Sequence, residues 1–179
     1  MMNIIITGKV DIGKTAVCSK LLELLTKADH NCGGILSLKD SNGNIEVYDI
    51  NSKKKALLAY FTHSELANGP KIGRYSFNKK GIEFGNKAII NTVNLEVLFI
   101  DELGYLELKD EGFKSAIKFI EKAKNKYVIL VIRDILLKQF LDKINLKFKV
   151  FEITELNRNE MPKIIYSYIK QDRQHLGLL

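Results

Sequence analysis

The first hydrophobic block of the chain is short and rich in β-branched residues. Residues 3–7 are Asn-Ile-Ile-Ile-Thr, a pattern typical of a buried strand. After a loop at residues 8–15 that contains two glycines, apolar side chains recur at helical spacing over residues 16–27, with lysine and glutamate on the opposite face. The pattern therefore predicts a strand, a glycine loop and a helix, in that order.

Between residues 33 and 95 the pattern is less regular and indicates antiparallel strands. Turn residues at 41–44 separate two strand patterns at 35–38 and 45–50, as in a β-hairpin. We expect a short helix at residues 53–61, a turn at 68–70, a strand at 72–77 and a helix at 83–93. We interpret this stretch as an insertion that contains a hairpin.

The second half of the chain alternates strands and helices. Strands are predicted at residues 96–100, 127–132 and 148–153, and helices at 111–124, 136–144 and 161–170. Alternation of this kind implies parallel strands joined by right-handed crossovers. We therefore expect residues 1–179 to form one α/β domain whose sheet is mostly parallel and is extended by the antiparallel hairpin.

Composition places the chain among folded proteins without membrane spans. It is 46% hydrophobic and 27% charged, and no apolar stretch approaches the length of a membrane span. The start lacks the features of a signal peptide, and the two cysteines, Cys18 and Cys32, form no Cys-x-x-Cys pair. With no heptad repeat and no unassigned apolar face, we expect a cytoplasmic monomer without disulfides.

The charge of the chain is basic, which raises the question of nucleic-acid binding. There are 28 lysines and arginines against 21 acidic residues, a net charge of +7. Only four of the basic residues are arginine, and the lysines are scattered over predicted helix faces and turns. We interpret the excess as a solvated lysine-rich surface, with nucleic-acid binding as the weaker alternative. The isolated histidines have no partners at zinc-ligand spacing.

The glycine loop carries the strongest chemical signal. Residues 8–15 match Gly-x4-Gly-Lys-Thr and lie between a predicted strand and a predicted helix, as a phosphate-binding loop requires. In such a loop the backbone N–H groups and the helix N-terminus hold phosphate oxygens, and the glycines allow close approach. Lys14 is expected to reach the β- and γ-phosphates, and the Thr15 hydroxyl is a suitable ligand for Mg2+. A nucleotide with magnesium is the implied cofactor set.

A second signal lies at the end of the strand predicted at residues 96–100. This strand is followed by Asp101 and Glu102, as in a Walker B segment. Asp101 is expected to orient Mg2+ through its water shell. Because neighbouring side chains in an extended chain point in different directions, Glu102 is expected to reach the water that attacks the γ-phosphorus. An acid directly after the metal aspartate favours hydrolysis over phosphoryl transfer.

Taken together, three segments of the sequence resemble the THEP1 family of nucleoside-triphosphatases. They are the loop at residues 8–15, the run Leu-Phe-Ile-Asp-Glu-Leu-Gly-Tyr-Leu-Glu-Leu at 98–108, and Phe-Glu-Ile-Thr-Glu-Leu-Asn-Arg-Asn at 151–159. Residues 33–34, 72–78 and 132–134 support the resemblance, which covers nearly the whole chain. It implies a three-layer P-loop α/β sandwich, and slow Mg2+-dependent hydrolysis of nucleoside triphosphates with broad base preference.

Carried over by position, the resemblance implies three groups of site residues. Lys14 and Glu102 would act in catalysis, and Thr15 and Asp101 would hold the metal. The nucleotide-binding set would comprise Gly8, Lys9, Val10, Asp11, Ile12, Gly13, Lys14, Thr15, Ala16, Asn157 and Arg158. Asn157 and Arg158 would lie beside the base or ribose, and the alternative is a turn that caps the last helix.

Some features of the site have two interpretations. Arg133 ends a predicted strand at the same sheet edge, so it either stabilises the transferring phosphoryl group or forms a salt bridge with Asp134 or a helix-start contact. The family usually has Pro and Gly where this chain has Val10 and Asp11. The Asp11 carboxylate would weaken phosphate binding unless it points outward. Tyr75 and Phe77 are interpreted as half-buried strand residues.

Two other functions remain open at this point. A nucleotide or nucleoside kinase would need an acceptor pocket and usually an arginine-bearing lid, and the four arginines are not clustered. A nucleotide-dependent switch or an RNA-binding module would use the same loop without turnover, as the net charge of +7 permits.

Overall fold

A computed structural model describes residues 2–62, 64–125 and 127–175. Over these residues the chain forms a nine-stranded sheet in the order β5-β6-β4-β3-β2-β7-β8-β1-β9. The strands are β1 (Met2–Gly8), β2 (Cys32–Lys39), β3 (Ile45–Asp49), β4 (Lys55–Tyr60), β5 (Lys71–Ile72), β6 (Tyr75–Phe77), β7 (Val97–Leu103), β8 (Tyr127–Arg133) and β9 (Lys149–Glu152).

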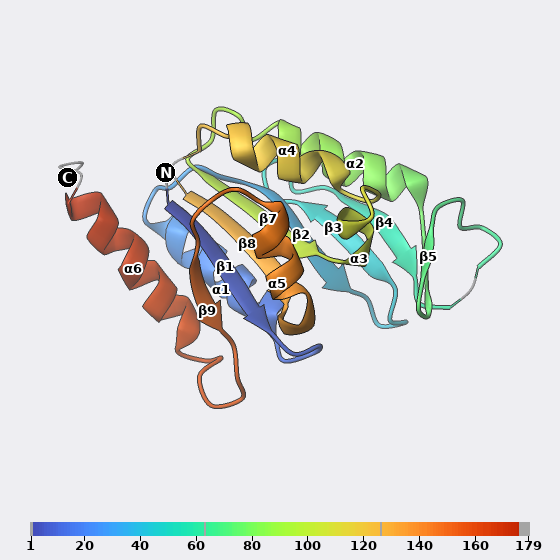
Figure 1. Ribbon diagram of the computed structural model, residues 1–179, viewed down its shortest axis with the longest axis horizontal. Helices are drawn as coiled ribbons and strands as arrows, with labels where there is room; N and C mark the ends of the chain where they lie inside the picture. Colours follow the sequence, from blue (N-terminus) through green and yellow to red (C-terminus); the bar gives the residue numbers. More distant parts are fainter. Residues whose placement is uncertain (1, 63, 126, 176–179) are drawn as a thin grey trace.

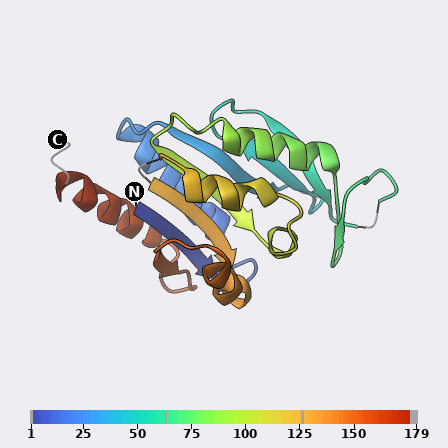
Figure 2. The ribbon, with the colours of Figure 1, turned by 45° about the horizontal axis from the view of Figure 1, so that its top comes forward.

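Six helices in the described residues cover the two faces of this sheet. They are α1 (Lys14–Lys27), α2 (Lys79–Ile90), α3 (Tyr105–Leu108), α4 (Lys114–Lys122), α5 (Asp134–Lys143) and α6 (Met161–His175). Helices α1 and α6 pack together on one face, and α2, α4 and α5 cover the other, with α2 beside α4 (Figures 1 and 2). The expected three-layer α/β sandwich is confirmed.

The apolar block at the start of the chain shows why the sheet carries two cores. Successive side chains of a strand point to opposite faces. Ile5 packs in the core beneath α2, α4 and α5, whereas Ile4 and Ile6 pack in the core beneath α1 and α6. All three side chains are buried because both faces of β1 are covered by helices. A run of consecutive β-branched residues is thus the correct pattern for a central strand.

The sheet divides into two regions that we name by their strand pairing. Strands β2, β7, β8, β1 and β9 pair in parallel and form the parallel half. Strands β3, β4, β6 and β5 continue the sheet beyond β2 by antiparallel pairing and form the antiparallel extension. The hairpin predicted around residues 41–44 is the junction between the two regions.

Two predicted elements of the extension were wrong. The helix expected at residues 53–61 is strand β4, because its backbone pairs with β3. Pairing with a neighbouring strand overrides the weak helical preference of a Lys-Ala-Leu sequence. The single strand expected at 72–77 is two short strands, β5 and β6, because Gly73 adopts a left-handed φ of 56° and reverses the chain. The short helix α3 was not predicted.

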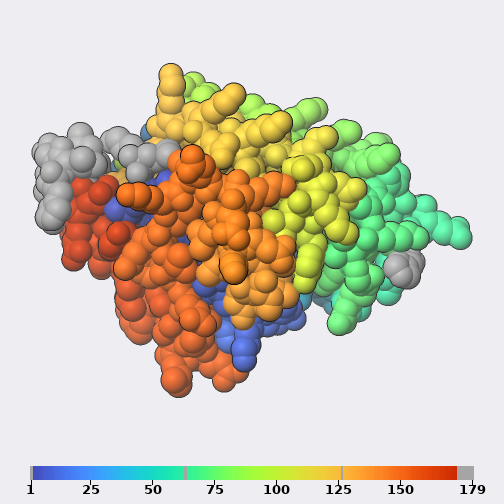
Figure 3. Space-filling model, in the orientation of Figure 1, coloured from blue at the N-terminus to red at the C-terminus, as the bar shows by residue number. Residues whose placement is uncertain are grey.

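The parallel strands bring their carboxyl ends to one edge of the sheet. The loop at residues 8–15 follows β1, Asp101 and Glu102 lie near the end of β7, and Arg133 ends β8. Ligands of open α/β sheets bind outside this edge. Figure 3 shows the loop segment, in blue, at the surface next to the orange segment that contains α5. No helix within the described residues has the length and apolar character needed to cross a membrane.

Candidate active site

The loop between β1 and α1 depends on two glycines. Gly8 has a φ of 147° and Gly13 a φ of 106°, both in the region that side chains disfavour. A Cβ on Gly8 would also lie 2.6 Å from the carbonyl oxygen of Ile153, so the loop crosses closely over the end of the neighbouring chain segment. Gly13 forms the N-cap of α1, which leaves the first backbone N–H groups of this helix available to an anion.

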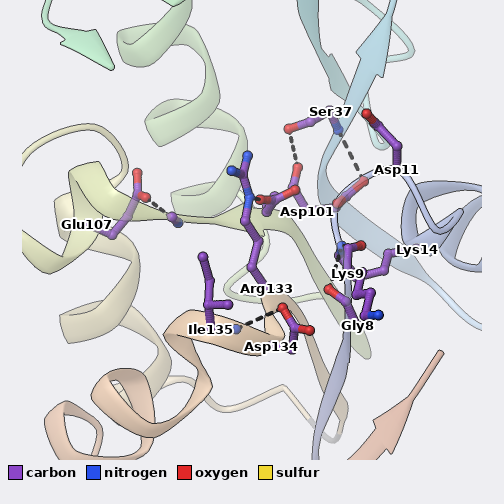
Figure 4. A network of polar contacts seen from close by, with 12 residues as sticks. Gly8, Lys9, Asp11, Lys14, Ser37, Asp101, Glu107, Arg133, Asp134 and Ile135 are labelled. Atoms are coloured by element: carbon purple, nitrogen blue, oxygen red, sulfur yellow. Dashed lines mark hydrogen bonds and ion pairs between the residues drawn. The ribbon is translucent and has the colours of Figure 1, made fainter. Parts of the chain in front are cut away.

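Lys14 is buried at the start of α1 and turns back under the loop. Its Nζ donates to the carbonyl oxygens of Gly8 at 3.0 Å and Lys9 at 2.7 Å (Figure 4). Burial lowers the pKa of Lys14, and the carboxylates of Glu102 and Asp101 oppose this shift. The loop carbonyls therefore hold the ammonium group in place beneath the backbone that would bind the phosphates, a contact that the sequence did not predict.

Asp101 is fully buried near the end of β7. The backbone N–H of Ser37 on β2 donates to its Oδ2 at 3.4 Å, and the Ser37 hydroxyl donates to its backbone carbonyl oxygen. Burial raises the pKa of Asp101 to about 7, the negative charge of Glu102 acts in the same direction, and the nearby Thr15 hydroxyl lowers it. The structure thus brings Asp101 and Thr15 together, as expected from the two motifs.

This pair of residues fits a divalent cation that keeps most of its water. Oδ1 of Asp101 is buried and has no hydrogen-bond partner in the described part of the chain. A buried polar atom of this kind usually has a partner, so it marks a place for a bound ion or water. Within residues 2–62, 64–125 and 127–175, no cluster of three His, Cys, Asp or Glu side chains forms a metal cage. Magnesium is held in this way, by few protein oxygens together with phosphates and waters.

Glu102 and Arg133 form an ion pair across the strand ends. Arg133 Nε donates to Glu102 Oε1, and both side chains are about one-quarter to one-third exposed, at 25% and 32%. Arg133 therefore pairs with Glu102 and not with Asp134, whose Oδ1 accepts the backbone N–H of Ile135. The expectation that Glu102 points away from Asp101 agrees with its partial exposure and with its position in the cavity described below. Sequence spacing gave no signal for this pairing.

Asp11 adopts the left-handed conformation, with a φ of 58°, that the loop requires at this position. Its Oδ1 accepts a hydrogen bond from Lys39 Nζ at 2.5 Å, and both side chains are exposed. The Lys39 ammonium holds the pKa of Asp11 below its ordinary value. Lys39 ends β2 and was not singled out from the sequence, because the two residues are 28 positions apart.

Asn157 and Arg158 lie in the loop after β9. The Asn157 side chain binds its own loop: its Oδ1 accepts the N–H of Thr154 at 2.9 Å, and its Nδ2 donates to the carbonyl oxygen of Glu152 at 2.9 Å. Its backbone carbonyl accepts the N–H of Met161 at the start of α6. Arg158 extends toward the phosphate-binding loop, where its Cδ would lie 3.8 Å from a Cβ on Gly13.

A cavity of about 890 Å³ opens beside the loop. Lys14, Thr15, Glu102 and Arg133 line one end of it. Its other walls come from the antiparallel extension and from α3 with its following loop, and they include Phe61, Arg74, Tyr75, Phe77, Leu106 and Phe113. The sequence interpretation of Tyr75 and Phe77 as strand residues is correct but incomplete, because both also face this cavity. Asn157 and Arg158 do not line it.

Comparison with known proteins agrees with this geometry. The model of a family described as NTPase matches residues 3–166. The THEP1 nucleoside-triphosphatase of Methanopyrus kandleri is 31% identical over 72% of both chains, and that of Methanosarcina barkeri is 28% identical over 97% of this chain and all of the relative. The chain belongs to the THEP1 family of nucleoside-triphosphatases. The resemblance of the sequence motifs to this family is confirmed.

Two solved structures share the fold. The crystal structure of THEP1 from Aquifex aeolicus has a TM-score of 0.72 and 20% identity, covering 93% of this chain and 98% of its own. The solution structure of a human cancer-related nucleoside triphosphatase has a TM-score of 0.76 and 20% identity, covering 97% of this chain and all of its own. The fold of the THEP1 family is therefore present over nearly the whole chain.

Proposed function

We propose that this THEP1-family chain hydrolyses nucleoside triphosphates to diphosphate and phosphate, that it requires Mg2+, and that it accepts several bases. The observation that carries the proposal is the placement of Lys14, Asp101 and Glu102 at one sheet edge beside a glycine loop. The relatives are nucleoside-triphosphatases by name, which supports the hydrolytic part of the proposal.

Residues of the chain divide the work between binding and proton transfer. The loop N–H groups and Lys14 bind the β- and γ-phosphates. Thr15 and Asp101 would hold the magnesium ion, which when bound neutralises charge on the phosphate oxygens. Glu102 accepts a proton from water as the water oxygen bonds to the γ-phosphorus and the bond to the bridging oxygen breaks, releasing the diphosphate. Arg133 orients the Glu102 carboxylate before the reaction.

A broad base preference follows from the few polar groups near the expected base position. The nucleoside leaves the loop on the side away from Glu102, toward Gly13 and Arg158. There the Asn157 side chain is already bonded to backbone groups, so it offers little discrimination between base edges. Arg158 can stack on any base, because every base has an aromatic face.

The test is phosphate release from ATP, GTP, CTP and UTP with Mg2+, with nucleotide affinity measured alongside. Lys14→Ala is expected to lose both affinity and release, because it removes the charge under the phosphates. Glu102→Gln is expected to bind nucleotide but to release phosphate at least about 100-fold more slowly, which is the scale of a general base. Chelation of the metal with EDTA is expected to stop release by the wild type.

Two matched control variants make the same changes of charge at positions outside the cavity. Lys20→Ala on the exposed side of α1 and Glu111→Gln before α4 change the same residue types outside the cavity, and they should behave as wild type. Unchanged release by Glu102→Gln would contradict its role as the base. A strong preference for one triphosphate would contradict the broad specificity while leaving the hydrolysis intact.

The cavity favours one second candidate, phosphoryl transfer to an acceptor other than water. Its volume of about 890 Å³ at the phosphate end provides the acceptor space that the sequence did not reveal. Radiolabelled γ-phosphate that appears in a nucleoside or nucleoside monophosphate, and not as free phosphate, would favour this candidate over hydrolysis.

A further inference from the structure

The cavity beside the loop extends from the residues that would bind the phosphates to the strands of the antiparallel extension. If the proposed function is correct, the γ-phosphate lies at the end lined by Lys14, Glu102 and Arg133, and the nucleoside points away toward Arg158. The far walls then remain free of nucleotide. The cavity measures about 890 Å³, within the range of about 300–1,000 Å³ of pockets for one small molecule, so with the nucleoside outside it there is room for another ligand at the far walls.

Aromatic rings form the far wall in a defined arrangement. Phe61 and Tyr75 pack edge to face, with ring centroids 5.7 Å apart and an interplanar angle of 70°. The Arg74 guanidinium lies over the Phe61 ring, 5.3 Å from its centroid. Both rings are half-buried and line the cavity together with Phe77. A flat aromatic molecule gains both ring packing and a guanidinium contact at such a wall.

Among the described residues that line the cavity, one solvent-exposed cation has no carboxylate partner. Lys39 pairs with Asp11, and Arg133 pairs with Glu102. Glu107 binds the backbone N–H groups of Gly104 and Phe113 at 2.7 Å each.

Lys14 binds the phosphates in the proposed function. Among the described cations that line the cavity, Arg74 is then the one without an anionic partner. In the part of the chain that the structure describes, Arg74 contacts the Phe61 ring and has no carboxylate at ion-pair distance. A ligand with a negative group would complete its charge.

We propose that this cavity binds a second ligand, a flat aromatic molecule with an anionic group, while a nucleoside triphosphate occupies the loop. The aromatic ring packs on Phe61 and Tyr75, and the anion pairs with Arg74. The ligand lies between the antiparallel extension and Glu102, next to the water that attacks the γ-phosphorus. Its binding therefore lowers the rate of phosphate release by restricting this water.

The probe is anilinonaphthalene sulfonate, a fluorescent aromatic anion, titrated into the full-length protein saturated with Mg2+ and a non-hydrolysable ATP analogue. One molecule is expected to bind per chain. Its neutral analogue, N-phenylnaphthylamine, has the same rings without the sulfonate and reports on the aromatic wall alone. Phe61→Ala should weaken both probes about tenfold, the loss of roughly one aromatic contact.

Arg74→Gln tests whether the Arg74 guanidinium binds the anionic group of the ligand or only supports the cavity wall. It should weaken the sulfonate probe at least about fivefold and leave the neutral probe unchanged. Lys71→Gln is the matched control, because Lys71 lies on the adjacent strand β5 and does not line the cavity. Lys14→Ala should lose phosphate release but keep its affinity for the probe. Phosphate release therefore tests the proposed hydrolysis, and probe affinity tests the second ligand site.

Three results would overturn the proposal. The first is displacement of the probe by the nucleotide analogue, which would make the cavity part of the nucleotide site. The second is an equal loss of affinity for both probes in Arg74→Gln. The third is unchanged affinity for both probes in Phe61→Ala. Competition with 1-naphthoate and with 1-naphthyl phosphate then distinguishes a carboxylate from a phosphate ester as the anion. Displacement by either one supports the site.

Discussion

The two regions of the sheet treat polar groups in opposite ways. The parallel half buries Lys14 and Asp101 near its carboxyl edge, and Oδ1 of Asp101 has no partner among the described residues. The antiparallel extension keeps the ion pair of Lys55 with Glu46 at the surface, and its buried Asp49 carboxylate accepts hydrogen bonds from Asn51 and Ser52. It also presents aromatic rings to the cavity. Burial of Lys14 and Asp101 lowers the stability of the parallel half but fixes their positions, whereas the extension determines the shape of the cavity.

This difference follows from how each region is covered. Strands β1, β7 and β8 are buried on both faces, so a polar residue at the end of such a strand is desolvated and its pKa shifts. The extension is anchored mainly by α2, which contacts β2, β3 and β4. Its half-buried residues can change without exposing a core. We therefore expect substitutions in the parallel half to alter chemistry, and substitutions in the extension to alter packing and ligand shape.

The largest expected effect is that of Asp101→Asn in the parallel half. Phosphate release should fall about 100-fold, at the upper end of the effect of residues that orient a metal site. Nucleotide affinity without Mg2+ should stay near that of wild type, because the loop and Lys14 are intact. Release and affinity measured over a Mg2+ titration would check both expectations.

The same substitution should raise the free energy of unfolding of the metal-free protein, by an amount that increases with pH. The pKa of Asp101 is raised to about 7 in the fold, above its ordinary value of 3.8, so the folded protein favours the protonated form. Wild-type stability therefore falls as pH rises from about 4 to 7, and the neutral asparagine removes this loss. At pH 8 the gain should be on the order of a few kcal/mol, and it should vanish near pH 4. A gain independent of pH would contradict burial as its cause.

The second effect is a loss of stability from Gly81→Ala in the extension. A Cβ on Gly81 would lie 2.1 Å from the carbonyl oxygen of Leu57, so α2 approaches the backbone of β4 directly. The added methyl group must move the helix or the strand, and we expect a cost of about 1–3 kcal/mol. Thermal or urea unfolding measures it. Affinity for nucleotide should change little, because the loop lies in the parallel half.

Gly73→Ala is the matched control for this prediction. A Cβ on Gly73 would meet nothing within 4 Å, and only its left-handed φ of 56° opposes the change. The expected loss is therefore about 1 kcal/mol. Equal destabilisation by the two substitutions would mean that backbone conformation, and not the contact between α2 and β4, limits the extension.

The predictability of the fold from sequence also differs between the two regions. Strands β1, β7, β8 and β9 were correctly predicted as parallel, and blocks such as Ile4-Ile5-Ile6, buried on both faces, leave no other interpretation. Strand β2 was predicted only as part of the hairpin, and its parallel pairing with β7 was not foreseen. In the extension, β4 was taken for a helix, because its Ala and Leu residues suit either state and its partner β3 decides between them. Local pattern was sufficient where burial is complete and insufficient where pairing determines the structure.

Within the site, residues in motifs were predictable and residues brought in by folding were not. Lys14, Thr15 and Asp101 lie together because the two motifs end strands β1 and β7, which flank β8 and bring their carboxyl ends to the same sheet edge. Lys39 comes from the end of β2, and Phe61 and Arg74 come from the extension, and no spacing in the chain relates any of them to the loop. Their proximity depends on the strand order, which places β3, β4 and β6 beyond β2.

The smallest expected effect concerns a contact at the border with the extension, between Asp11 in the loop and Lys39 at the end of β2, where the hairpin to β3 begins. Both side chains are exposed, at 51% and 69%, so the pair should contribute less than about 1 kcal/mol to stability. Its consequence should be larger for nucleotide affinity, because Lys39 neutralises a carboxylate beside the phosphates. Lys39→Ala should weaken binding about threefold to fivefold at low salt, and less at high salt.

The double variant that combines Lys39→Ala with Asp11→Asn shows whether Lys39 acts through Asp11 or directly on the nucleotide. If the lysine only neutralises the carboxylate, Asp11→Asn should restore the affinity lost in Lys39→Ala, because the asparagine leaves no charge to neutralise. If the lysine contacts a phosphate itself, the double variant should remain as weak as Lys39→Ala. Isothermal titration with a non-hydrolysable analogue, over all four members of the cycle, separates the two cases. Restored affinity would show that Lys39, at the end of β2, influences nucleotide binding by neutralising Asp11 and not by a contact of its own with the phosphates.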